Sequence, residues 1–272
     1  MKFIRKLYIN FSYRSLDTLG ARQYFKMLFG FLRNIPSIIR TKNLKIMDSQ
    51  FSNQPVLSYR DVFGNGLKIN PQMNDTAIEN DSAILGQVRE MVIKNCYFKY
   101  FDFEKNKRFA TVVDLGANRA LFSLMMSGIS DHVYLVESNS NYNSVIDANF
   151  KMNNRTNYTR TNHFIGSLGI HFKPELDHIS FSNWVEKSGI DKIELLKIDI
   201  EGSEFSIFKE GFDWKNVKYI TMEVHPDCGN PKEIVEILVN CDFKVRAADS
   251  LLLEIENIEQ ADYLFAVNQN WN

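Results

Sequence analysis

The pattern of apolar and polar positions changes along the chain, and from about residue 110 short apolar runs alternate with stretches of helical spacing. Such alternation is typical of parallel strands joined by crossover helices, so we expect an α/β fold. The predicted strands are 111–115, 132–137, a weaker one near 159–165, 194–200, 217–224, 243–247 and 263–267. The last two, with the apolar segment 251–255 between them, are predicted to run antiparallel.

Residues 15–35 have the pattern of a basic amphipathic helix, which Ser15 or Asp17 can cap and which Pro36 cannot continue. One stripe is apolar and another is basic; they consist of Ala21, Phe25, Leu28, Leu32 and Ile35, and of Arg22, Lys26 and Arg33. Two interpretations follow: the helix lies on an anionic membrane surface, or it packs on its own domain with the basic face in solvent.

Between these regions the pattern predicts a hairpin over 57–70, turning at Gly64-Asn65-Gly66, and a helix over 81–101. We therefore expect a basic N-terminal segment (1–45), a small cap with hairpin and helix (46–110), and an α/β domain (111–272).

Composition narrows the class of protein. The chain has 272 residues and is 44% hydrophobic, which is enough for a proper core. Its net charge of −1 hides +9 over residues 1–45 and −10 over the remainder, and the acidic main body argues against nucleic acid as a substrate. Three cysteines and five histidines show no metal-ligand spacing and no disulfide framework, and no apolar run is long enough to span a bilayer. A reducing, cytoplasmic compartment without a metal site is the expectation.

The stretch "VVDLGANRALFSL" places chemistry at the end of the first predicted strand. Asp114 closes the strand, Gly116 permits a tight turn, and the helix after Asn118 offers unpaired N–H groups to a ligand. Glu137 ends the next strand, where an acid accepts hydrogen bonds from the hydroxyls of an adenosine ribose in doubly wound folds. The pair predicts a nucleoside-containing cofactor. A nicotinamide fingerprint would need further glycines, which this loop lacks.

A second group of carboxylates follows a later strand, in "LLKIDIEGSEF". Asp199 and Glu201 lie where ligands bind in open parallel sheets, at the carboxyl end of a strand. On the next strand Glu223 and His225 share a face by the two-residue period and approach the same edge. The two strands are therefore predicted to line one cleft.

Taken together, "VVDLGAN", "LLKIDIEGSEF" and "ITMEVHP" occur in an order that resembles the FkbM-type family of S-adenosylmethionine-dependent methyltransferases. The resemblance covers roughly residues 110–268. It implies a Rossmann-like doubly wound sheet of the class I methyltransferase type with an antiparallel C-terminal strand. It also implies S-adenosylmethionine as cofactor, with Asp114 and the loop backbone facing its methionine end, and O-methylation of a saccharide or secondary metabolite.

For that reaction His225 is the residue whose unperturbed pKa suits a base, because a free imidazole titrates near neutrality. Asp199 or Glu201 could orient it or bind acceptor hydroxyls, and His225 and Asp199 rank first. Arg119 and Ala120 depart from the family pattern, which has a small or aliphatic residue and then glycine. Two other functions stay open on these residues: a noncatalytic S-adenosylmethionine- or nucleotide-binding module, and a nicotinamide-dependent oxidoreductase. Peripheral contact with an anionic membrane through residues 1–45 is a further expectation.

Overall fold

The structure is a computed structural model that describes residues 2–42, 44, 51, 54, 56–70, 84–104, 106–166 and 177–271. The chain divides into two compact units. Unit 1 comprises Met1–Cys96 with Asn143–Thr156, and unit 2 comprises Tyr97–Tyr142 with Asn157–Asn272. Each unit is described by itself below.

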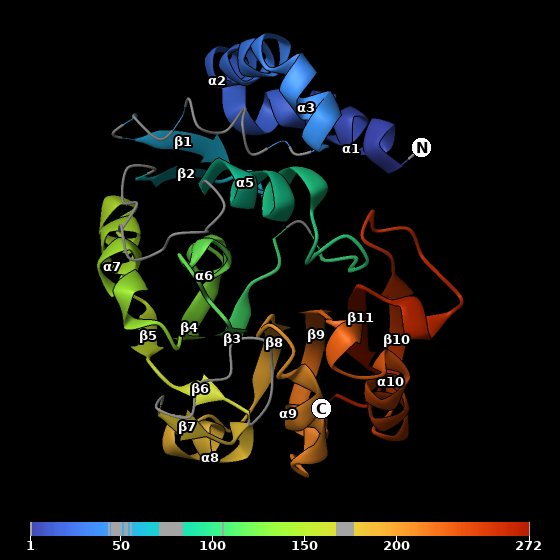
Figure 1. Ribbon diagram of the computed structural model, residues 1–272. Helices are drawn as coiled ribbons and strands as arrows, with labels where there is room; N and C mark the ends of the chain where they lie inside the picture. Colours follow the sequence, from blue (N-terminus) through green and yellow to red (C-terminus); the bar gives the residue numbers. More distant parts are fainter. Residues whose placement is uncertain are drawn as a thin grey trace. The chain divides into compact units, whose positions relative to one another are not determined.

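Unit 2 is built on a seven-stranded sheet of order β10-β11-β9-β8-β3-β4-β5, which Figure 1 shows from β5 on the left to β10 on the right. The strands are β3 (Phe109–Leu115), β4 (Ser130–Val136), β5 (Tyr158–Thr161), β8 (Ile193–Ile198), β9 (Val217–Glu223), β10 (Phe243–Ala248) and β11 (Tyr263–Asn268). Neighbours from β5 to β9 pair in parallel, whereas β11 pairs antiparallel with both β9 and β10. The predicted α/β fold with an antiparallel C-terminal strand is confirmed.

The order of the strands reverses beside β3, since the chain adds β4 and β5 on one side and β8 and β9 on the other. Such a switch point opens a ligand-binding crevice at the carboxyl ends of the strands. Leu115 is level with both Val136 and Ile198, so the residues that follow β3, β4 and β8 meet at one edge. This edge carries the predicted site.

Within the described residues of unit 2, the sheet is accompanied by the helices α6 (Leu121–Ser127), α8 (Phe181–Lys187), α9 (Glu204–Lys209) and α10 (Pro231–Asn240). Buried side chains of α8, α9 and α10 form one core with apolar residues of the strands. The rings of Phe208 and Trp214 stack in this core with centroids 4.2 Å apart. The predicted strand near 159–165 is in fact divided, because Phe164–Ile165 (β6) leaves the sheet to pair with β7 (His178–Ile179). Short 3-10 turns complete unit 2: η3 (Ser140–Tyr142), η4 (Trp214–Asn216), η5 (Pro226–Cys228) and η6 (Ile258–Gln260).

Unit 1 contains α1 (Lys2–Asn10), α2 (Tyr13–Arg33), α3 (Ile35–Thr41), β1 (Leu57–Arg60), β2 (Gly66–Ile69), α5 (Ile84–Val88), η2 (Arg89–Lys94) and α7 (Asn143–Met152). The predicted hairpin is confirmed, with β1 and β2 antiparallel. The predicted helix over 15–35 is present in α2, but Gly20 interrupts it with φ 69° and ψ 160°. Pro36 stands in the first turn of a new helix, where a missing N–H costs nothing.

The helix predicted over 81–101 is shorter than expected. Residues 81–83 lie outside the described part, and η2 is a π-helical segment that stops at Lys94. Asn95 adopts the left-handed conformation (φ 63°) and its N–H bonds to the carbonyl of Glu90, which ends the helix. Among the described residues, no helix has the length and apolar character needed to cross a bilayer.

Candidate active site

The loop after β3 is pressed against the end of β8. Gly116 has φ 76°, and a Cβ placed there would lie 1.7 Å from the carbonyl oxygen of Asp199. Only glycine tolerates both the left-handed backbone and this close approach. The glycine predicted from the sequence is therefore required for packing within the protein, whatever its contact with a ligand.

Glu137 follows β4 and fixes the same loop through its carboxylate. It accepts hydrogen bonds from the backbone N–H of Asn118 at 2.7 Å and of Asn139 at 2.8 Å. Asn118 has φ 51°, a left-handed conformation that asparagine tolerates well. Burial raises the pKa of Glu137, and the two N–H groups act in the opposite direction. Each carboxylate oxygen accepts one of these bonds and has a second acceptor site, which fits the two hydroxyls of an adenosine ribose.

Asp114 is fully buried and belongs to an ion network that the sequence analysis missed. Its carboxylate accepts a hydrogen bond from the Ser123 hydroxyl at 2.6 Å and lies 3.0 Å from the ammonium of Lys197. Lys197 also donates to the carbonyl of Gly116 at 2.7 Å and lies 3.6 Å from Asp199. These protein partners occupy Asp114, so its predicted contact with the methionine end of a cofactor has no direct support in this geometry.

Asp199 stands at the end of β8 and is the least enclosed carboxylate of this network, with its side chain 22% exposed. The Tyr97 hydroxyl donates to it at 2.7 Å. Burial raises the pKa of Asp199, and the nearby Glu201 and Glu204 act in the same direction, while Lys197 and Tyr97 oppose them. The result is an oriented, partly accessible carboxylate whose proton affinity exceeds that of an ordinary aspartate.

His225 lies between two carboxylates beyond the end of β9. Its Nδ1 is 3.1 Å from Glu204, which is fully buried, and its Nε2 is 3.3 Å from Glu201. Burial opposes the charge of the imidazole, but the hydrogen bonds to Glu201 and Glu204 outweigh it and raise the pKa of His225 to about 11. The unperturbed pKa on which the sequence analysis relied therefore does not hold, and at neutral pH this side chain is an imidazolium.

Three of these side chains are close enough together to be considered as ligands of a metal ion. In the described part of the chain, Asp199, Glu201 and His225 form one group whose ligand atoms all lie within 4.8 Å of one another. A protonated imidazole offers N–H groups and no lone pair, so a cation would first have to displace the proton of His225. The imidazolium already supplies positive charge between Glu201 and Glu204.

Arg119 is buried, with its guanidinium 5.8 Å from the centre of the Tyr142 ring. This cation–π contact accounts for a long side chain at a position where the family pattern has a small one. Ala120 has φ 57° and is the N-cap residue directly before α6. The left-handed backbone explains why glycine is the usual residue there.

The structure therefore brings the predicted site residues to one edge of the sheet, in two sets. The first set is the loop after β3 with Glu137, and the second is Asp199, Glu201 and His225. Sequence reasoning missed Lys197 and Tyr97. A lysine inside the apolar run of β8 was a usable signal, because a buried lysine needs a charged partner; Tyr97 carried no comparable signal. An open groove of about 490 Å³ in unit 1 contains none of the predicted site residues.

Comparisons with known proteins agree with this architecture. Residues 88–245 match the family model described as the methyltransferase FkbM domain. No curated protein sequence matches the chain.

Three similar solved structures each have a low sequence identity to this chain. An rRNA methylase from Streptococcus thermophilus is 9% identical with a TM-score of 0.42, covering 60% of this chain and 87% of its own. Precorrin-6y C5,15-methyltransferase from Geobacter metallireducens is 16% identical with a TM-score of 0.37, covering 59% and 80%. TrmK from M. capricolum, bound to S-adenosylhomocysteine, is 12% identical with a TM-score of 0.42, covering 60% and 64%. At these values the likenesses say nothing about the acceptor.

Proposed function

Because this chain belongs to the FkbM family of S-adenosylmethionine-dependent methyltransferases, we propose that it methylates a hydroxyl group, with Asp199 as the base. Membership of this family excludes the nicotinamide-dependent oxidoreductase and the noncatalytic module that the sequence alone left open. The acceptor proposed here is a saccharide or a secondary metabolite rich in hydroxyl groups.

S-adenosylmethionine supplies an electrophilic methyl group on a sulfonium when it is bound. Among the residues of this chain, Glu137 would hold the ribose hydroxyls, and Gly116 and Asn118 would shape the loop beside it. The two backbone bonds to Glu137 support this assignment, because they fix the carboxylate before any ligand arrives. Preorganisation of this kind avoids an ordering cost on binding.

The observation that carries the proposal is the environment of Asp199. A hydroxyl that attacks a methyl group must lose its proton, and a base is most effective when its pKa approaches the working pH. Asp199 has a raised pKa, partial exposure and an orientation set by Tyr97 and Lys197. It would accept the proton as the new carbon–oxygen bond forms and the bond between carbon and sulfur breaks.

His225 and Glu201 have a different role in this proposal. An imidazolium between two carboxylates has no free lone pair for a proton, so His225 orients Glu201 and does not act as the base. Glu201 is half exposed (52%) and would accept hydrogen bonds from further hydroxyls of the acceptor. A polar edge with several carboxylate acceptors suits a polyhydroxylated molecule.

The test is methyl transfer from labelled S-adenosylmethionine to a panel of saccharides and hydroxylated metabolites. Asp199→Asn is expected to reduce kcat by about 10²–10⁴-fold, as loss of a general base typically does. Cofactor affinity, measured by calorimetry, should hardly change. The kcat of the wild-type enzyme should fall as the pH drops through the raised pKa of Asp199, and Asp199→Asn should lack this dependence.

Two variants serve as controls. Asp191→Asn removes an exposed carboxylate just before β8, at the opposite end of the strand, and should leave kcat unchanged. His225→Gln should raise the KM for the acceptor more than it lowers kcat. If Asp199→Asn keeps near-normal turnover while His225→Gln loses it, the assignment of the base is wrong.

A further inference from the structure

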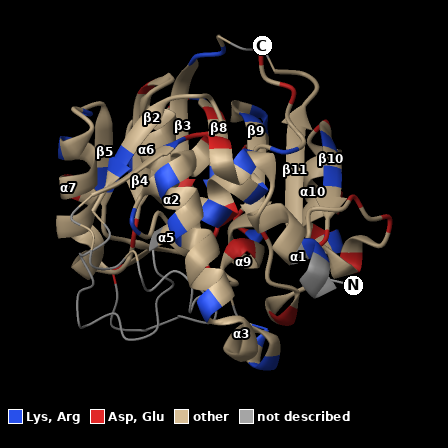
Figure 2. Cartoon of the chain, turned by 90° about the horizontal axis from the view of Figure 1, so that it is seen from above, with Lys and Arg blue, Asp and Glu red and all other residues tan. Residues whose placement is uncertain are grey.

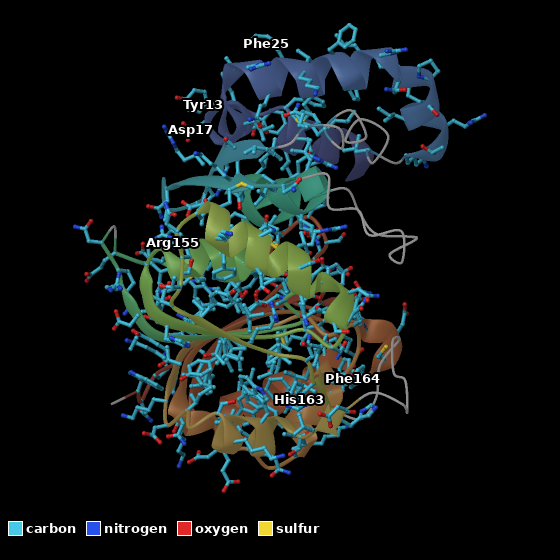
Figure 3. The ribbon with its side chains drawn as sticks, turned by 90° about the vertical axis from the view of Figure 1, so that its left-hand side faces the viewer. Tyr13, Asp17, Phe25, Arg155, His163 and Phe164 are labelled. Carbon is cyan, nitrogen blue, oxygen red and sulfur yellow. The ribbon has the colours of Figure 1, made fainter. Side chains whose placement is uncertain are left out.

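Helix α2 of unit 1 has one buried side, and its opposite side is exposed and strongly apolar. After the interruption at Gly20, Met27 and Gly30 are buried, and they lie on one side of the helix. Phe25 and Phe29 are each 61% exposed, and Leu32 is 55% exposed. At roughly 100° per residue these three side chains share the opposite side of the helix. Figure 3 shows Phe25 on the side of α2 that faces away from the hairpin. The apolar stripe predicted from the sequence is therefore mainly an outer surface of the unit.

Other large hydrophobic side chains of α1, α2 and α3 are also exposed. Tyr8 in α1 is 77% exposed, Tyr13 at the start of α2 is 83% exposed, and Ile39 in α3 is 63% exposed. Exposed apolar residues that stand singly are ordinary, but a gathering of them marks an interaction surface. Aromatic side chains with a polar tip, such as tyrosine, are favoured where lipid meets water.

Basic residues border this apolar surface. Between Tyr13 and Lys42 the chain has six basic residues and a single acid, Asp17. Asp17 pairs with Arg60 at 3.1 Å, and no ion pair to Arg22, Arg33 or Arg40 is present within the described residues. Figure 2 shows Lys and Arg repeated along α2 and α3. Arg22 and Arg33 follow the apolar face on one side of α2, and both are exposed.

We propose that the outer face of α2 and α3 docks on an anionic lipid bilayer. The apolar side chains Phe25, Phe29 and Leu32 would enter the boundary between headgroups and acyl chains, while Arg22 and Arg33 contact anionic headgroups. A helix that lies in this interface needs an apolar face with basic residues beside it. A second copy of this chain fits the face less well, because two basic surfaces would meet. The proposal stands on the exposed residues of unit 1 and does not depend on the methylation reaction.

The full chain is mixed with neutral vesicles of phosphatidylcholine, or with anionic vesicles of phosphatidylcholine and phosphatidylglycerol. The fraction of protein that sediments with the vesicles is measured at low and at high salt. Binding is expected only with the anionic vesicles, and it should weaken with salt because the attraction is screened over roughly 8 Å at physiological ionic strength. Each basic residue near the surface contributes roughly five-fold to partitioning, so Arg22→Gln with Arg33→Gln should reduce the partition coefficient about 25-fold. Phe25→Ser with Phe29→Ser should reduce the fraction of protein that sediments with anionic vesicles, at low salt and at high salt alike.

The matched control variants remove exposed basic or apolar side chains from unit 2. Lys187→Gln with Lys244→Gln removes two exposed basic residues of unit 2, and Val239→Ser removes an exposed apolar one (54%). Both controls should bind vesicles as the wild type does, and the melting temperatures of all variants should stay close to that of the wild type. Equal binding to neutral vesicles, no binding at low salt, or an equal loss in the controls would overturn the proposal. So would a dimer that Phe25→Ser with Phe29→Ser dissociates, since a second copy would then cover the face.

Discussion

At the scale of single residues, Ala120 replaces the glycine of the family pattern and lowers the stability of the fold. Its φ of 57° puts a Cβ in the left-handed region, which costs roughly 1–2 kcal/mol. We expect Ala120→Gly to raise the free energy of unfolding by about 0.5–1 kcal/mol, since glycine avoids this strain but gains freedom in the unfolded chain. Urea denaturation measures the change. Ala117→Gly, at a buried neighbour without a left-handed backbone, should instead destabilise; equal effects of both would show that Ala120 is not strained.

Glu137 carries the residue-scale prediction for the cofactor. Glu137→Gln keeps the shape of the side chain but removes the charge, and hydrogen bonds to a charged group typically contribute about 1.5–3 kcal/mol. We expect the dissociation constant for S-adenosylmethionine to rise at least ten-fold in calorimetric titration. Glu210→Gln is the matched control, because Glu210 also accepts a backbone N–H, from Phe181 at 2.7 Å. Unchanged affinity in Glu137→Gln would remove Glu137 from the ribose site.

Sequence reasoning found residue types at the ends of strands, but not what those residues contact. Asp114 and Glu137 were predicted on equal terms as cofactor contacts, yet Asp114 pairs with Lys197 inside the protein and Glu137 holds the loop backbone. For His225 the predicted pKa was that of a free imidazole, because Glu204 is 21 residues earlier in the chain and only folding brings the two together. The assignments of the site residues to catalysis and binding stay predictions.

At the scale of elements, the ammonium of Lys197 joins the ends of β3 and β8 through Asp114, Gly116 and Asp199. Removing one member of a buried ion network leaves an uncompensated charge, which typically costs about 3–5 kcal/mol. We expect Lys197→Met to destabilise the protein by this amount in urea denaturation, and Lys197→Met combined with Asp114→Asn to recover part of the loss.

Lys218→Met is the control for that change, since Lys218 is 26% exposed and pairs with Glu194 at 3.4 Å near the other end of the sheet. It should cost about 1 kcal/mol or less, as partly exposed pairs do. A loss of under 1 kcal/mol in Lys197→Met would mean that the network adds little to the stability of the fold.

The elements that the sequence predicted best are those with a strong local signal. Except for the divided strand near 159–165, each predicted strand from 111–115 to 263–267 corresponds to one strand of unit 2, because apolar runs between turns need little tertiary context. The predictions that differ depend on backbone details: Gly20 interrupts α2, and Asn95 ends the helical segment after Lys94. For residues 15–35 one apolar stripe was predicted, but Ile35 belongs to α3 and not to α2. The structure also shows that Phe25 and Leu32 are exposed, which the sequence pattern could not decide.

At the scale of the whole molecule, the near-zero net charge is the sum of a basic segment and an acidic remainder. Composition alone could show this asymmetry, which supports the expectation that nucleic acid is not a substrate. Lys2, Lys6 and Lys45 count toward the +9 of residues 1–45, but their side chains lie outside the described part. The division into segments 1–45, 46–110 and 111–272 stays a prediction.

The stability of the molecule should depend on pH through His225. Its pKa is raised to about 11 in the folded protein, against about 6.5 for an unperturbed imidazole, so the folded state keeps a proton that the unfolded state releases between these values. The stabilisation is complete below pH 6.5 and is lost as the pH rises toward 11. We expect the free energy of unfolding to fall across pH 7–9.5 with a contribution of up to one proton from this residue.

Urea denaturation at pH 6.5, 8 and 9.5 tests this expectation, with His225→Gln as the comparison. The variant should be less stable than the wild type at pH 6.5, because Glu204 remains buried without its cationic partner. The difference between the two proteins should shrink as the pH rises, since only in the wild type does the unfolded state release an imidazole proton that the folded state keeps. Parallel pH profiles would mean that His225 is not held as a cation between Glu201 and Glu204, and its exclusion as the catalytic base would lose its physical ground.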